Sequence, residues 1–427
     1  MKIGKNFFLN KKILIYGLGK SGISTFRFLK NKADVYLFDD NKKTNKKIIN
    51  HSQLLKTEFD RIIISPGINI LNCKLSKFLK KNFSKIYTDL DVFFSFFKNK
   101  SVAITGTNGK STTAKILYDV LLDQKKDVRL IGNIGNPALS EKKISKKTFF
   151  VIEVSSYQLD YSKLFSAKYA IILNISADHI ERHKNLTNYV NAKFKLLESQ
   201  NRQSFAYVKK YDDLINKRIK KSKFKQKIYE VDTLNVRKVL NQLNNKYFNS
   251  SGNRENLSFI LKISSKLKLN NNKLINTLRN FKGLKYRQQI IFDRKNLTII
   301  NDSKSTSFAS SENILKNLKD VYWIIGGIPK ERDKFKLSKK ECKNFRAFIF
   351  GKHHKQFSNI LGNKVKFKKF ENLKLTLQNV FLEIKKKKTK KNLIFFSPAG
   401  ASFDNFKNFE DRGEYFNQLI KKFIDAK

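Results

Sequence analysis

Short apolar runs rich in β-branched residues alternate along the chain with longer stretches whose apolar residues have helical spacing. The runs before residue 180 are KILIYG, DVYLFDD, RIIISPG, SVAITG, FFVIEVSS and YAIILNI. The pattern resumes near residue 290 with LTIINDS, VYWIIGG, FRAFIFG and NLIFFSPAG. Strands that alternate with helices are typical of parallel sheets with crossover helices. The pattern therefore predicts an α/β fold.

The runs form three groups, and a chain of 427 residues is too long for one ordinary domain. Polar breaks at FFKNKS (96–101) and FKGLKYR (281–287) are the places where the groups meet. We therefore predict domains at 1–98, 99–283 and 284–427. The first and third are expected to be Rossmann-like, and the central one to be a parallel sheet like that of P-loop ATPases.

The charge of the chain raises the question of a nucleic-acid partner, because 89 Lys and Arg face only 35 Asp and Glu, a net charge of +54. The excess is spread over every segment, and A/T-rich codons encode the abundant Lys, Asn, Ile and Phe. The densest run, KKKKTKK (385–391), has no interleaved aromatic residues and predicts a solvated helix end and loop. We expect no nucleic-acid partner, although such a surface would steer anionic substrates toward the protein.

Other features of the composition bear on location. No apolar run is long enough to span a bilayer, so no membrane insertion is expected. The N-terminal apolar run breaks at Gly17 without a small-residue cleavage site, which indicates a first strand rather than an export signal. Cys73 and Cys342 are too few for a disulfide framework and have no metal-ligand spacing. We expect a cytoplasmic monomer.

A first glycine loop, YGLGKSG (16–22), follows the first strand and precedes a helical stretch. Its Gly-x-Gly-x-x-Gly spacing lets the backbone approach a diphosphate at a helix N-terminus, and Asp39 follows the next strand at a suitable distance. A nicotinamide dinucleotide and a UDP-sugar both contain such a diphosphate. Glycines that serve only strand–helix packing are the structural alternative.

A second glycine loop, GTNGKST, joins the strand-like SVAIT to an amphipathic helix. Its glycines allow backbone N–H groups to point at phosphate oxygens, while Lys110 can reach the β- and γ-phosphates and the Ser111 hydroxyl can bind Mg²⁺. The loop therefore predicts an ATP site rather than a packing turn, formed by Gly106, Thr107, Asn108, Gly109, Lys110, Ser111 and Thr112.

Glu153 and His179 each end a strand-like run on the sheet edge where this loop is expected. Such a position suits ligands of the metal that accompanies a triphosphate. The alternatives are a solvated glutamate and a histidine that packs in the core or at the surface.

The motifs together resemble the Mur ligase family, the ATP-dependent enzymes that add amino acids during peptidoglycan assembly. The segments that carry the resemblance are GLGKSGIS, SPGI, the short loop GTNGKSTT, GNIGNPAL, EVSSYQL, NISADHIERH, NDSKSTS and SPAGASFDNFKNFEDRGEYF. They extend over nearly the whole chain. The resemblance implies ATP-dependent joining of D-glutamate to UDP-MurNAc-L-Ala through an acyl phosphate. The Asp-Asn-Pro-Arg element of the diaminopimelate-adding relatives is absent.

The resemblance also implies roles for individual residues. The nucleotide sugar would contact Gly17, Leu18, Gly19, Asp39 and Gly67, and its sugar-peptide part Asn133 and Ser155. Two Mg²⁺ ions would be held by Ser111, Glu153, His179 and Lys193. Lys193 matches a lysine that is carbamylated in relatives, which turns an ammonium into an anion able to bind Mg²⁺. Lys110, His179 and Lys193 would be the catalytic residues.

The remaining implied contacts concern ATP and the amino acid. ATP would contact Asn253, Asn256, Arg287 and Asp302. D-Glutamate, a dicarboxylate that needs cations and hydroxyls, would contact Lys304, Thr306, Lys330, Ser402 and Phe409. The chain departs from the family pattern at Gly252, where a histidine is usual, and at the charged segment ERDKF (331–335).

Overall fold

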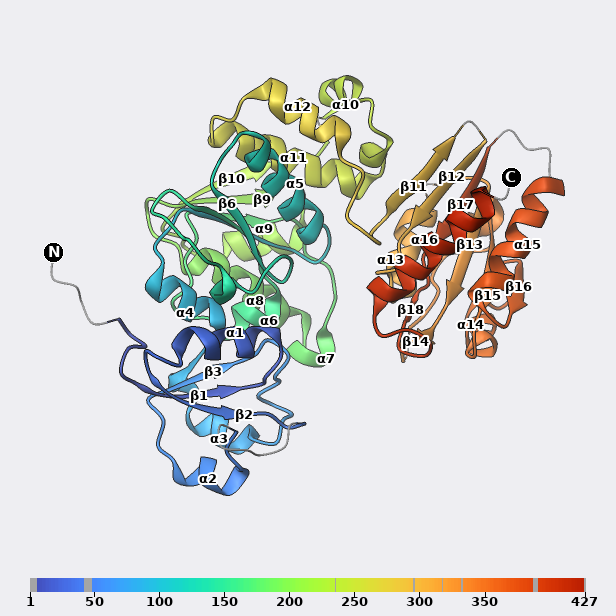
Figure 1. Cartoon of the computed structure of the whole chain (residues 1–427). Helices are drawn as coiled ribbons and strands as arrows, with labels where there is room; N and C mark the ends of the chain where they lie inside the picture. The colour runs from blue at the N-terminus through green and yellow to red at the C-terminus, as the bar shows by residue number, and fades with distance from the viewer. Residues whose placement is uncertain are drawn as a thin grey trace. The chain divides into compact units, whose positions relative to one another are not determined.

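The structure, a computed structural model, describes residues 6–41, 48–234, 236–294, 296–316, 318–331, 333–386 and 391–425. The chain divides into two compact units, Met1–Asn280 and Phe281–Lys427 (Figure 1). Both units consist of sheets with helices on their faces, so the predicted α/β class is confirmed. The boundary between residues 98 and 99 stays a prediction.

The first sheet of unit 1 has four parallel strands in the order β2-β1-β3-β4. Its strands are β1 (Lys12–Tyr16), β2 (Asp34–Phe38), β3 (Arg61–Ile64) and β4 (Ile86–Tyr87). The helices of this region are α1 (Lys20–Leu29), α2 (His51–Lys56), α3 (Ser76–Lys81) and α4 (Asp89–Phe96), with the 3₁₀ turn η1 (Phe83–Lys85). The first glycine loop therefore joins β1 to α1, as its sequence predicts.

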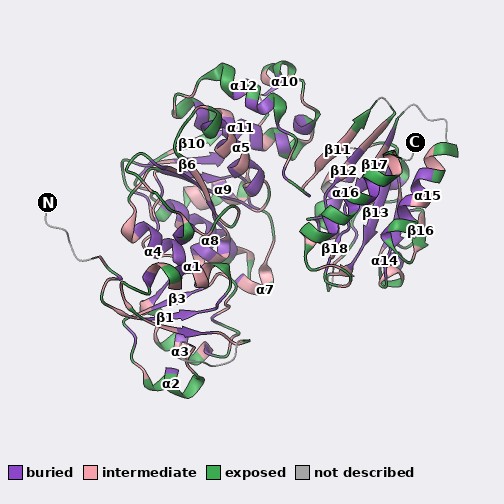
Figure 2. Ribbon diagram, viewed as in Figure 1, coloured by how far each residue is buried: buried purple, intermediate pink, exposed green. Residues whose placement is uncertain are grey.

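The second sheet of unit 1 has six parallel strands in the order β10-β9-β8-β5-β7-β6. They are β5 (Ser101–Thr105), β6 (Val128–Gly132), β7 (Phe149–Glu153), β8 (Tyr169–Ile172), β9 (Phe205–Lys209) and β10 (Lys227–Val231). The helices are α5 (Lys110–Asp123), α6 (Ser156–Tyr161), α7 (Ile180–His183), α8 (Leu186–Glu198), α9 (Asp213–Lys220), α10 (Arg237–Leu243), α11 (Ser251–Lys266) and α12 (Asn271–Asn280), with η2 (Ala138–Ser140) and η3 (Lys246–Asn249). Every residue of β5 is buried, which explains its uninterrupted run of small and apolar residues. Figure 2 shows the contrast between a buried strand such as β1 and the exposed helix α2.

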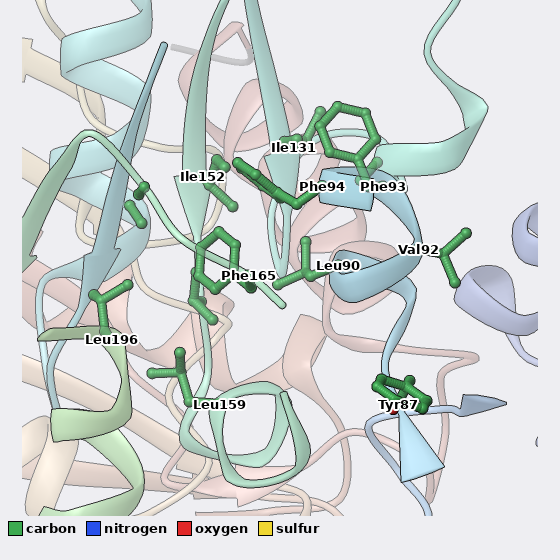
Figure 3. Packing of buried hydrophobic residues seen from close by; sticks show 14 of the residues in the cluster. Tyr87, Leu90, Val92, Phe93, Phe94, Ile131, Ile152, Leu159, Phe165 and Leu196 are labelled. Carbon is green, nitrogen blue, oxygen red and sulfur yellow. The ribbon is translucent and has the colours of Figure 1, made fainter. Parts of the chain in front are cut away.

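Apolar packing joins α4 to this second sheet (Figure 3). The ring of Phe93 lies edge-on to Phe150 of β7, with centroids 5.0 Å apart, and Phe94 lies edge-on to Phe165 at 4.8 Å. The buried carboxylate of Asp91 adds a polar connection. Its Oδ2 accepts hydrogen bonds from the backbone and hydroxyl of Thr88, and its Oδ1 accepts four from residues 162–165.

Unit 2 has one six-stranded sheet in the order β11-β12-β17-β13-β15-β16. Its strands are β11 (Gln289–Arg294), β12 (Leu297–Asn301), β13 (Val321–Gly326), β15 (Phe345–Phe350), β16 (Phe367–Phe370) and β17 (Asn392–Phe396). A short ribbon pairs β14 (Ile328–Pro329) with β18 (Gly400–Ala401). The helices are α13 (Phe308–Leu315), α14 (His354–Leu361), α15 (Leu373–Lys386) and α16 (Phe409–Asp425), with η4 (Glu341–Asn344).

One feature of this sheet corrects the expectation of purely parallel strands, because β11 runs antiparallel to β12. β11 ends at Arg294 and β12 begins at Leu297, whereas a parallel pair needs a crossover connection of about a dozen residues or more. The predicted helix end at 385–391 agrees with α15 as far as Lys386, and residues 387–390 lie outside the described part. Among the described residues, every helix is too short or too polar to cross a membrane.

Candidate active site

The second glycine loop connects the end of β5 to the start of α5. Gly109 caps the helix with φ 82°, a left-handed conformation that L side chains rarely adopt. A Cβ at this position would lie 2.1 Å from Asn256 Oδ1 on α11. Glycine is therefore needed both for the turn and for the close approach of α11.

A second segment, which follows β8, holds the loop in place. The backbone N–H of Thr107 donates to the carbonyl of Asn174 (2.9 Å), and that of Asn108 donates to Asn174 Oδ1 (2.9 Å). Ser176 N–H donates to the hydroxyl of Thr107 at 3.0 Å. Asn174 also bonds to Glu255, which forms an ion pair with Lys209 at 2.5 Å. The loop geometry thus depends on residues that sequence reasoning did not identify.

Two lysines converge on the same loop carbonyl. Lys110 Nζ donates to the carbonyls of Gly106 (2.9 Å) and Thr107 (2.8 Å), and Lys193 Nζ donates to that of Gly106 at 2.8 Å. Lys193 is 1% exposed. Burial first, and then the nearby Lys110 ammonium, hold the pKa of Lys193 well below its usual range. The neutral amine of Lys193 is therefore favoured more than in an ordinary lysine.

Tyr189 links Lys193 to the loop and was missed by sequence reasoning. Its ring lies 4.4 Å from Lys193 Nζ, and its hydroxyl shares a hydrogen bond of 3.1 Å with Thr107 Oγ1. Burial raises the pKa of Tyr189, so the phenol stays protonated. The i, i+4 spacing from Lys193 on α8 puts both side chains on one helix face and is the signal that would have identified it.

Glu153 ends β7 beside the strand that leads into the loop, in register with Ile104 of β5. Its Oε1 accepts a hydrogen bond from Asn133 Nδ2 at 2.8 Å. Its Oε2 is buried and has no hydrogen-bond partner within the described residues. A buried carboxylate oxygen without a partner is costly unless a cation approaches it, so the residues present fit a Mg²⁺ ion. Within the described ranges no group of three His, Cys, Asp or Glu forms a metal cluster, so other oxygen ligands such as the Ser111 hydroxyl would be required.

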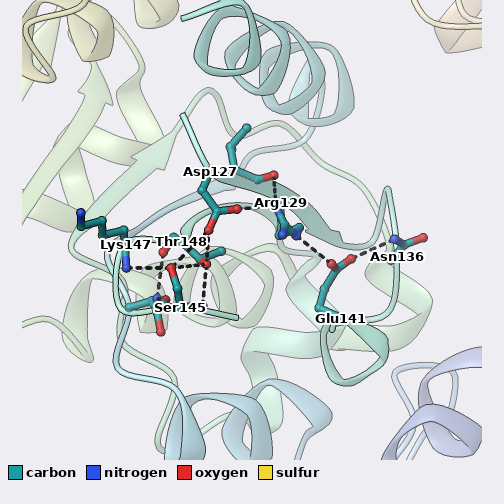
Figure 4. Close-up of polar contacts among 9 residues, drawn as sticks. Asp127, Arg129, Asn136, Glu141, Ser145, Lys147 and Thr148 are labelled. Atoms are coloured by element: carbon teal, nitrogen blue, oxygen red, sulfur yellow. Dashed lines mark hydrogen bonds and ion pairs between the residues drawn. The ribbon is translucent and has the colours of Figure 1, made fainter. Parts of the chain in front are cut away.

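A polar network supports the turn that carries Asn133 (Figure 4). Asn136 Nδ2 donates to Glu141 at 2.8 Å, and Glu141 pairs with Arg129 at 3.4 Å. Arg129 also pairs at 2.5 Å with Asp127, which accepts a hydrogen bond from the Thr148 hydroxyl. That hydroxyl bond, more than Arg129, lowers the pKa of Asp127. The network fixes both ends of β6 and so the position of the Asn133 turn.

The structure corrects the expected placement of His179 at the end of a strand, because β8 already ends at Ile172. His179 instead precedes α7 with φ 54°, and its side chain is 41% exposed. The imidazole lies 3.5 Å from Asp178 and stacks at a tilt on Tyr157, with ring centroids 4.9 Å apart. An exposed ring between carboxylates and an aromatic face remains accessible to a ligand.

One pocket of about 330 Å³ brings most of these residues together. Six of its lining residues were predicted from the sequence: Gly67, Lys110, Asn133, Ser155, His179 and Lys193. The other four were not: Pro66, Ser156, Tyr157 and Tyr189. The pocket therefore joins the SPG turn after β3 to the loop after β5, which lies 40 residues further along the chain.

The first glycine loop has a different construction and lies outside the lining of that pocket. The N–H of Leu18 donates to Asp39 Oδ2 at 2.6 Å, and the Ser65 hydroxyl donates to the Gly17 carbonyl at 2.6 Å. A Cβ on Gly22 would lie 1.9 Å from that same carbonyl oxygen. Gly17 and Gly22 thus serve packing, whereas a Cβ on Gly19 would contact nothing within 4 Å.

Comparison with known proteins agrees with this arrangement. Residues 104–274 match the Mur ligase middle domain. A Rickettsia felis protein named UDP-N-acetylmuramoylalanine–D-glutamate ligase is 33% identical over 445 residues, which cover 98% of each chain. The chain belongs to the Mur ligase family.

The fold of this Mur ligase is shared with solved structures of low sequence identity. The UDP-N-acetylmuramate-alanine ligase MurC of Thermotoga maritima has a TM-score of 0.55 at 18% identity and covers 98% of this chain and 100% of its own. The MurF ligase of the same organism, in complex with ADP, has a TM-score of 0.57 at 14% identity and covers 98% and 97%.

In this Mur ligase the two asparagines of α11 are both buried. Asn253 Nδ2 donates to the Tyr247 carbonyl at 2.8 Å, and Asn256 packs against Gly109. The structure therefore brings Asn256 to the second glycine loop, while a contact of either residue with adenine stays a prediction.

The residues predicted for unit 2 of the Mur ligase lie next to several strands: Asp302, Lys304 and Thr306 follow β12, Lys330 follows β14, Ser402 follows β18, and Arg287 precedes β11. Asp302 follows β12, is buried, and accepts hydrogen bonds from Gln288 N–H (3.1 Å) and Ser397 Oγ (3.0 Å). Burial raises the pKa of Asp302 to about 7, against the lowering effect of Ser397. Lys304 Nζ lies 4.0 Å from the ring centre of Phe409. Of the other predicted positions, Arg287 is half-buried, Ser402 is buried, and Thr306 and Lys330 are exposed.

Arg412, which sequence reasoning missed, holds this end of unit 2 together. It is fully buried and donates to the Ser303 hydroxyl (3.1 Å), the Ser303 carbonyl (2.7 Å) and the Gly400 carbonyl (2.9 Å). Burial lowers the pKa of Arg412 to about 10, so it remains a cation at neutral pH. A charged residue within the segment FEDRGEYF is the only hint the sequence offers.

Proposed function

We propose that this Mur ligase joins D-glutamate to UDP-MurNAc-L-Ala at the expense of ATP, in the cytoplasmic assembly of peptidoglycan precursors. The observation that carries the proposal is the pocket of about 330 Å³ described above. In it, Lys110 of the second glycine loop, called the phosphate loop from here on, lies with Gly67, Asn133, Ser155, His179 and Lys193. The relative from Rickettsia felis bears the name of this activity at 33% identity over nearly the full length. The protein would act as a monomer on small-molecule substrates, without nucleic acid or membrane insertion.

The phosphate loop would bind the triphosphate of ATP through the backbone N–H groups of residues 106–112. Lys110, whose ammonium already lies against two loop carbonyls, would turn toward the β- and γ-phosphates and stabilise the charge on the transferred group. Asn253 and Asn256 would contact the adenine side, and Arg287 with Asp302 would reach ATP from residues 281–427.

The chemistry requires an activated acyl group, because a carboxylate does not react with an amine in water. An oxygen of the L-alanine carboxylate attacks the γ-phosphorus, and the bond to ADP breaks. The amine of D-glutamate then attacks the acyl carbon, phosphate leaves, and the new amide nitrogen loses a proton. No protein nucleophile takes part, so the residues act by position and charge. Alignment of reactants is worth about 7–11 kcal/mol in favourable cases.

Ser111, Glu153, His179 and Lys193 would hold Mg²⁺, and two ions are expected. Bound Mg²⁺ supplies positive charge that neutralises the phosphate oxygens. Lys193 would contribute after its neutral amine attacks CO₂, which forms an N–C bond, releases a proton and leaves a carbamate anion. Its burial and low pKa support this role, because only the neutral amine is a nucleophile.

The remaining predicted residues divide between the other two substrates. The nucleotide sugar would contact the first glycine loop and the SPG turn, at Gly17, Leu18, Gly19, Asp39 and Gly67. D-Glutamate would contact residues of unit 2, where cations and hydroxyls suit a dicarboxylate: Lys304, Thr306, Lys330, Ser402 and Phe409.

Phosphate release with UDP-MurNAc-L-Ala and ATP, measured against a panel of D- and L-amino acids, tests the proposal. Release that depends on D-glutamate is expected. Release with L-lysine or diaminopimelate instead would identify a relative that adds a different amino acid. Reduction of a nicotinamide, seen as an absorbance change without ADP release, would show that the first glycine loop marks a dehydrogenase and would overturn the proposal.

A further inference from the structure

Unit 2 contains a large cavity whose lining includes none of the candidate site residues. Its volume is about 950 Å³, and it lies where the strands β13, β15, β16 and β17 begin, with Val321, Phe345, Phe367 and Asn392 in its lining. Asp302 follows the opposite, carboxyl end of β12 in the same sheet, and Ser402 follows β18 of the short ribbon. In a parallel sheet these two ends are opposite edges, so this cavity is separate from the candidate amino-acid site.

The cavity is unusually rich in cations, even for this chain. Seven of its eighteen lining residues are Lys or Arg, whereas the whole chain has 89 in 427. The lining contains a single acidic residue, Asp320. The cationic residues are Lys339, Lys340, Lys343, Arg346, Lys364, Lys366 and Lys368. Lys and Arg therefore make up a larger share of this lining than of the chain as a whole.

Only some of these cationic side chains form an ion pair or a hydrogen bond. Arg346 and Lys368 both pair with Glu383, at 2.6 and 2.9 Å. Lys364 donates to the Phe335 carbonyl at 3.2 Å. Lys339, Lys340, Lys343 and Lys366 are exposed and form no ion pair with any described residue. Like charges around one concave site repel each other, and a bound polyanion would relieve that repulsion.

The size and shape of the cavity restrict the class of ligand. A concave site of 950 Å³ lies within the range of small-molecule pockets, about 300–1,000 Å³. Of the four aromatic side chains in its lining, Tyr322, Phe345 and Phe348 are buried, and Phe367 alone is half-exposed, so the lining offers no series of free faces on which successive bases could stack. A compact anion with several charges fits this site better than a nucleic-acid strand does. Lysine ammonium groups act as point charges that bind phosphate oxygens.

We propose that this cavity binds a small molecule that carries several contiguous phosphates, at a site separate from the phosphate loop. Inorganic polyphosphate and nucleoside polyphosphates share that chemistry. The proposal does not depend on the reaction proposed above, because no residue of the cavity belongs to the candidate active site.

The test compares two triple variants of the full chain that remove the same charge. Lys339→Gln/Lys343→Gln/Lys366→Gln alters the cavity. Lys374→Gln/Lys421→Gln/Lys422→Gln alters equally exposed lysines of unit 2 outside its lining. Binding of inorganic tripolyphosphate is measured by calorimetry, and hydrogen exchange locates the protected peptides. Guanosine triphosphate is tested in parallel.

The cavity variant is expected to bind tripolyphosphate about tenfold more weakly, and the control variant within twofold of the unaltered chain. Protection should cover residues 339–346 and 363–368. Tighter binding of guanosine triphosphate at these peptides would indicate a nucleoside ligand, and equal binding would indicate recognition of the phosphates alone. Equal losses in both triple variants, protection confined to residues 106–112, or no binding at millimolar tripolyphosphate would each overturn the proposal.

Discussion

The two glycine loops of unit 1 join a strand to a helix in the same way but are stabilised differently. In the first, the carboxylate of Asp39 accepts the Leu18 N–H, and Gly22 packs on the Gly17 carbonyl. In the second, Asn174 from the segment after β8 holds the backbone, and the Lys110 ammonium lies against the loop carbonyls. The first loop is supported by an acidic side chain, and the second carries a lysine that donates to two of its carbonyls.

We expect this difference to distinguish binding from catalysis. In the first loop the supporting side chain, Asp39, is an anion, and the one lysine of the loop, Lys20, is exposed at the start of α1. In the second loop the supporting side chain, Asn174, is neutral, and Lys110 lies against the loop itself, where we expect it to stabilise a phosphate that changes charge during reaction. The glycines predict phosphate at both loops, and the supporting residues lead us to expect chemistry at the second.

Replacement of Lys110 should have the largest effect. Lys110→Ala removes the cation that stabilises the transferred phosphoryl group, so kcat for phosphate release should fall by at least about 10²–10³-fold. The matched control is Lys115→Ala on the same helix, whose ammonium pairs with Asp119 outside the pocket. It should leave kcat within twofold. Near-normal turnover of a folded Lys110→Ala protein would remove the distinction between the loops.

Alanine substitutions at Gly22 and at Gly109 should distinguish the roles of the two glycine loops. In Gly22→Ala the Cβ meets a backbone oxygen at 1.9 Å, so the free energy of unfolding should fall by about 1–3 kcal/mol. In Gly109→Ala the clash is with the Asn256 side chain, which is able to shift, and the left-handed φ costs about 1–2 kcal/mol.

Urea unfolding and phosphate release on both variants give the comparison. Of the two variants, Gly22→Ala should show the larger loss in free energy of unfolding, and Gly109→Ala the larger loss in kcat for phosphate release. The reverse order would mean that the first loop, and not the second, is the catalytic one.

Replacement of Asp39 tests how the first loop is closed. Asp39→Ala removes the charged acceptor of the Leu18 N–H and should lower the free energy of unfolding by about 1–2 kcal/mol. Asp39→Asn keeps an acceptor oxygen and should lose less. Equal stability of both variants and the unaltered chain in urea would show that the carboxylate is not what closes the loop.

The smallest change in stability is expected for Gly19→Ala, whose Cβ would contact nothing within 4 Å. The free energy of unfolding should stay within about 0.5 kcal/mol. The added methyl group would, however, occupy the open face of the loop, so KM for UDP-MurNAc-L-Ala should rise severalfold with kcat nearly unchanged. An unchanged KM would mean that the diphosphate does not bind there.

Local patterns in the sequence were sufficient to predict much of the fold. All ten apolar runs named from the sequence lie in strands, because buried parallel strands need continuous apolar residues. The short strands β4 and β14, and the polar edge strand β16, lack such runs and were not predicted. The antiparallel pairing of β11 with β12 was not predicted, because an apolar run does not reveal the direction of its strand.

The site was predictable where residues belong to contiguous motifs. Lys110 and Glu153 were identified in this way, whereas Lys193 came only from the resemblance to the family; the pocket lining contains Lys110 and Lys193. Asn174, Tyr189 and Arg412 were missed because their roles arise from contacts between distant segments. The prediction that His179 ends a strand was wrong, because His179 lies beyond the end of β8. A histidine in a polar turn leaves no periodic pattern in the sequence from which its position could be predicted.

The buried carboxylate of Asp91 has a practical consequence for anyone who wishes to excise the N-terminal sheet as an independent fragment. A cut after residue 98 would separate Asp91 from the backbone N–H groups of residues 163–165, and it would expose the phenylalanines of α4 that face Phe150 and Phe165. Both fragments would then expose apolar surface, and we expect them to aggregate on expression. We expect a cut near residue 280, between the two compact units, to yield two folded fragments that do not aggregate.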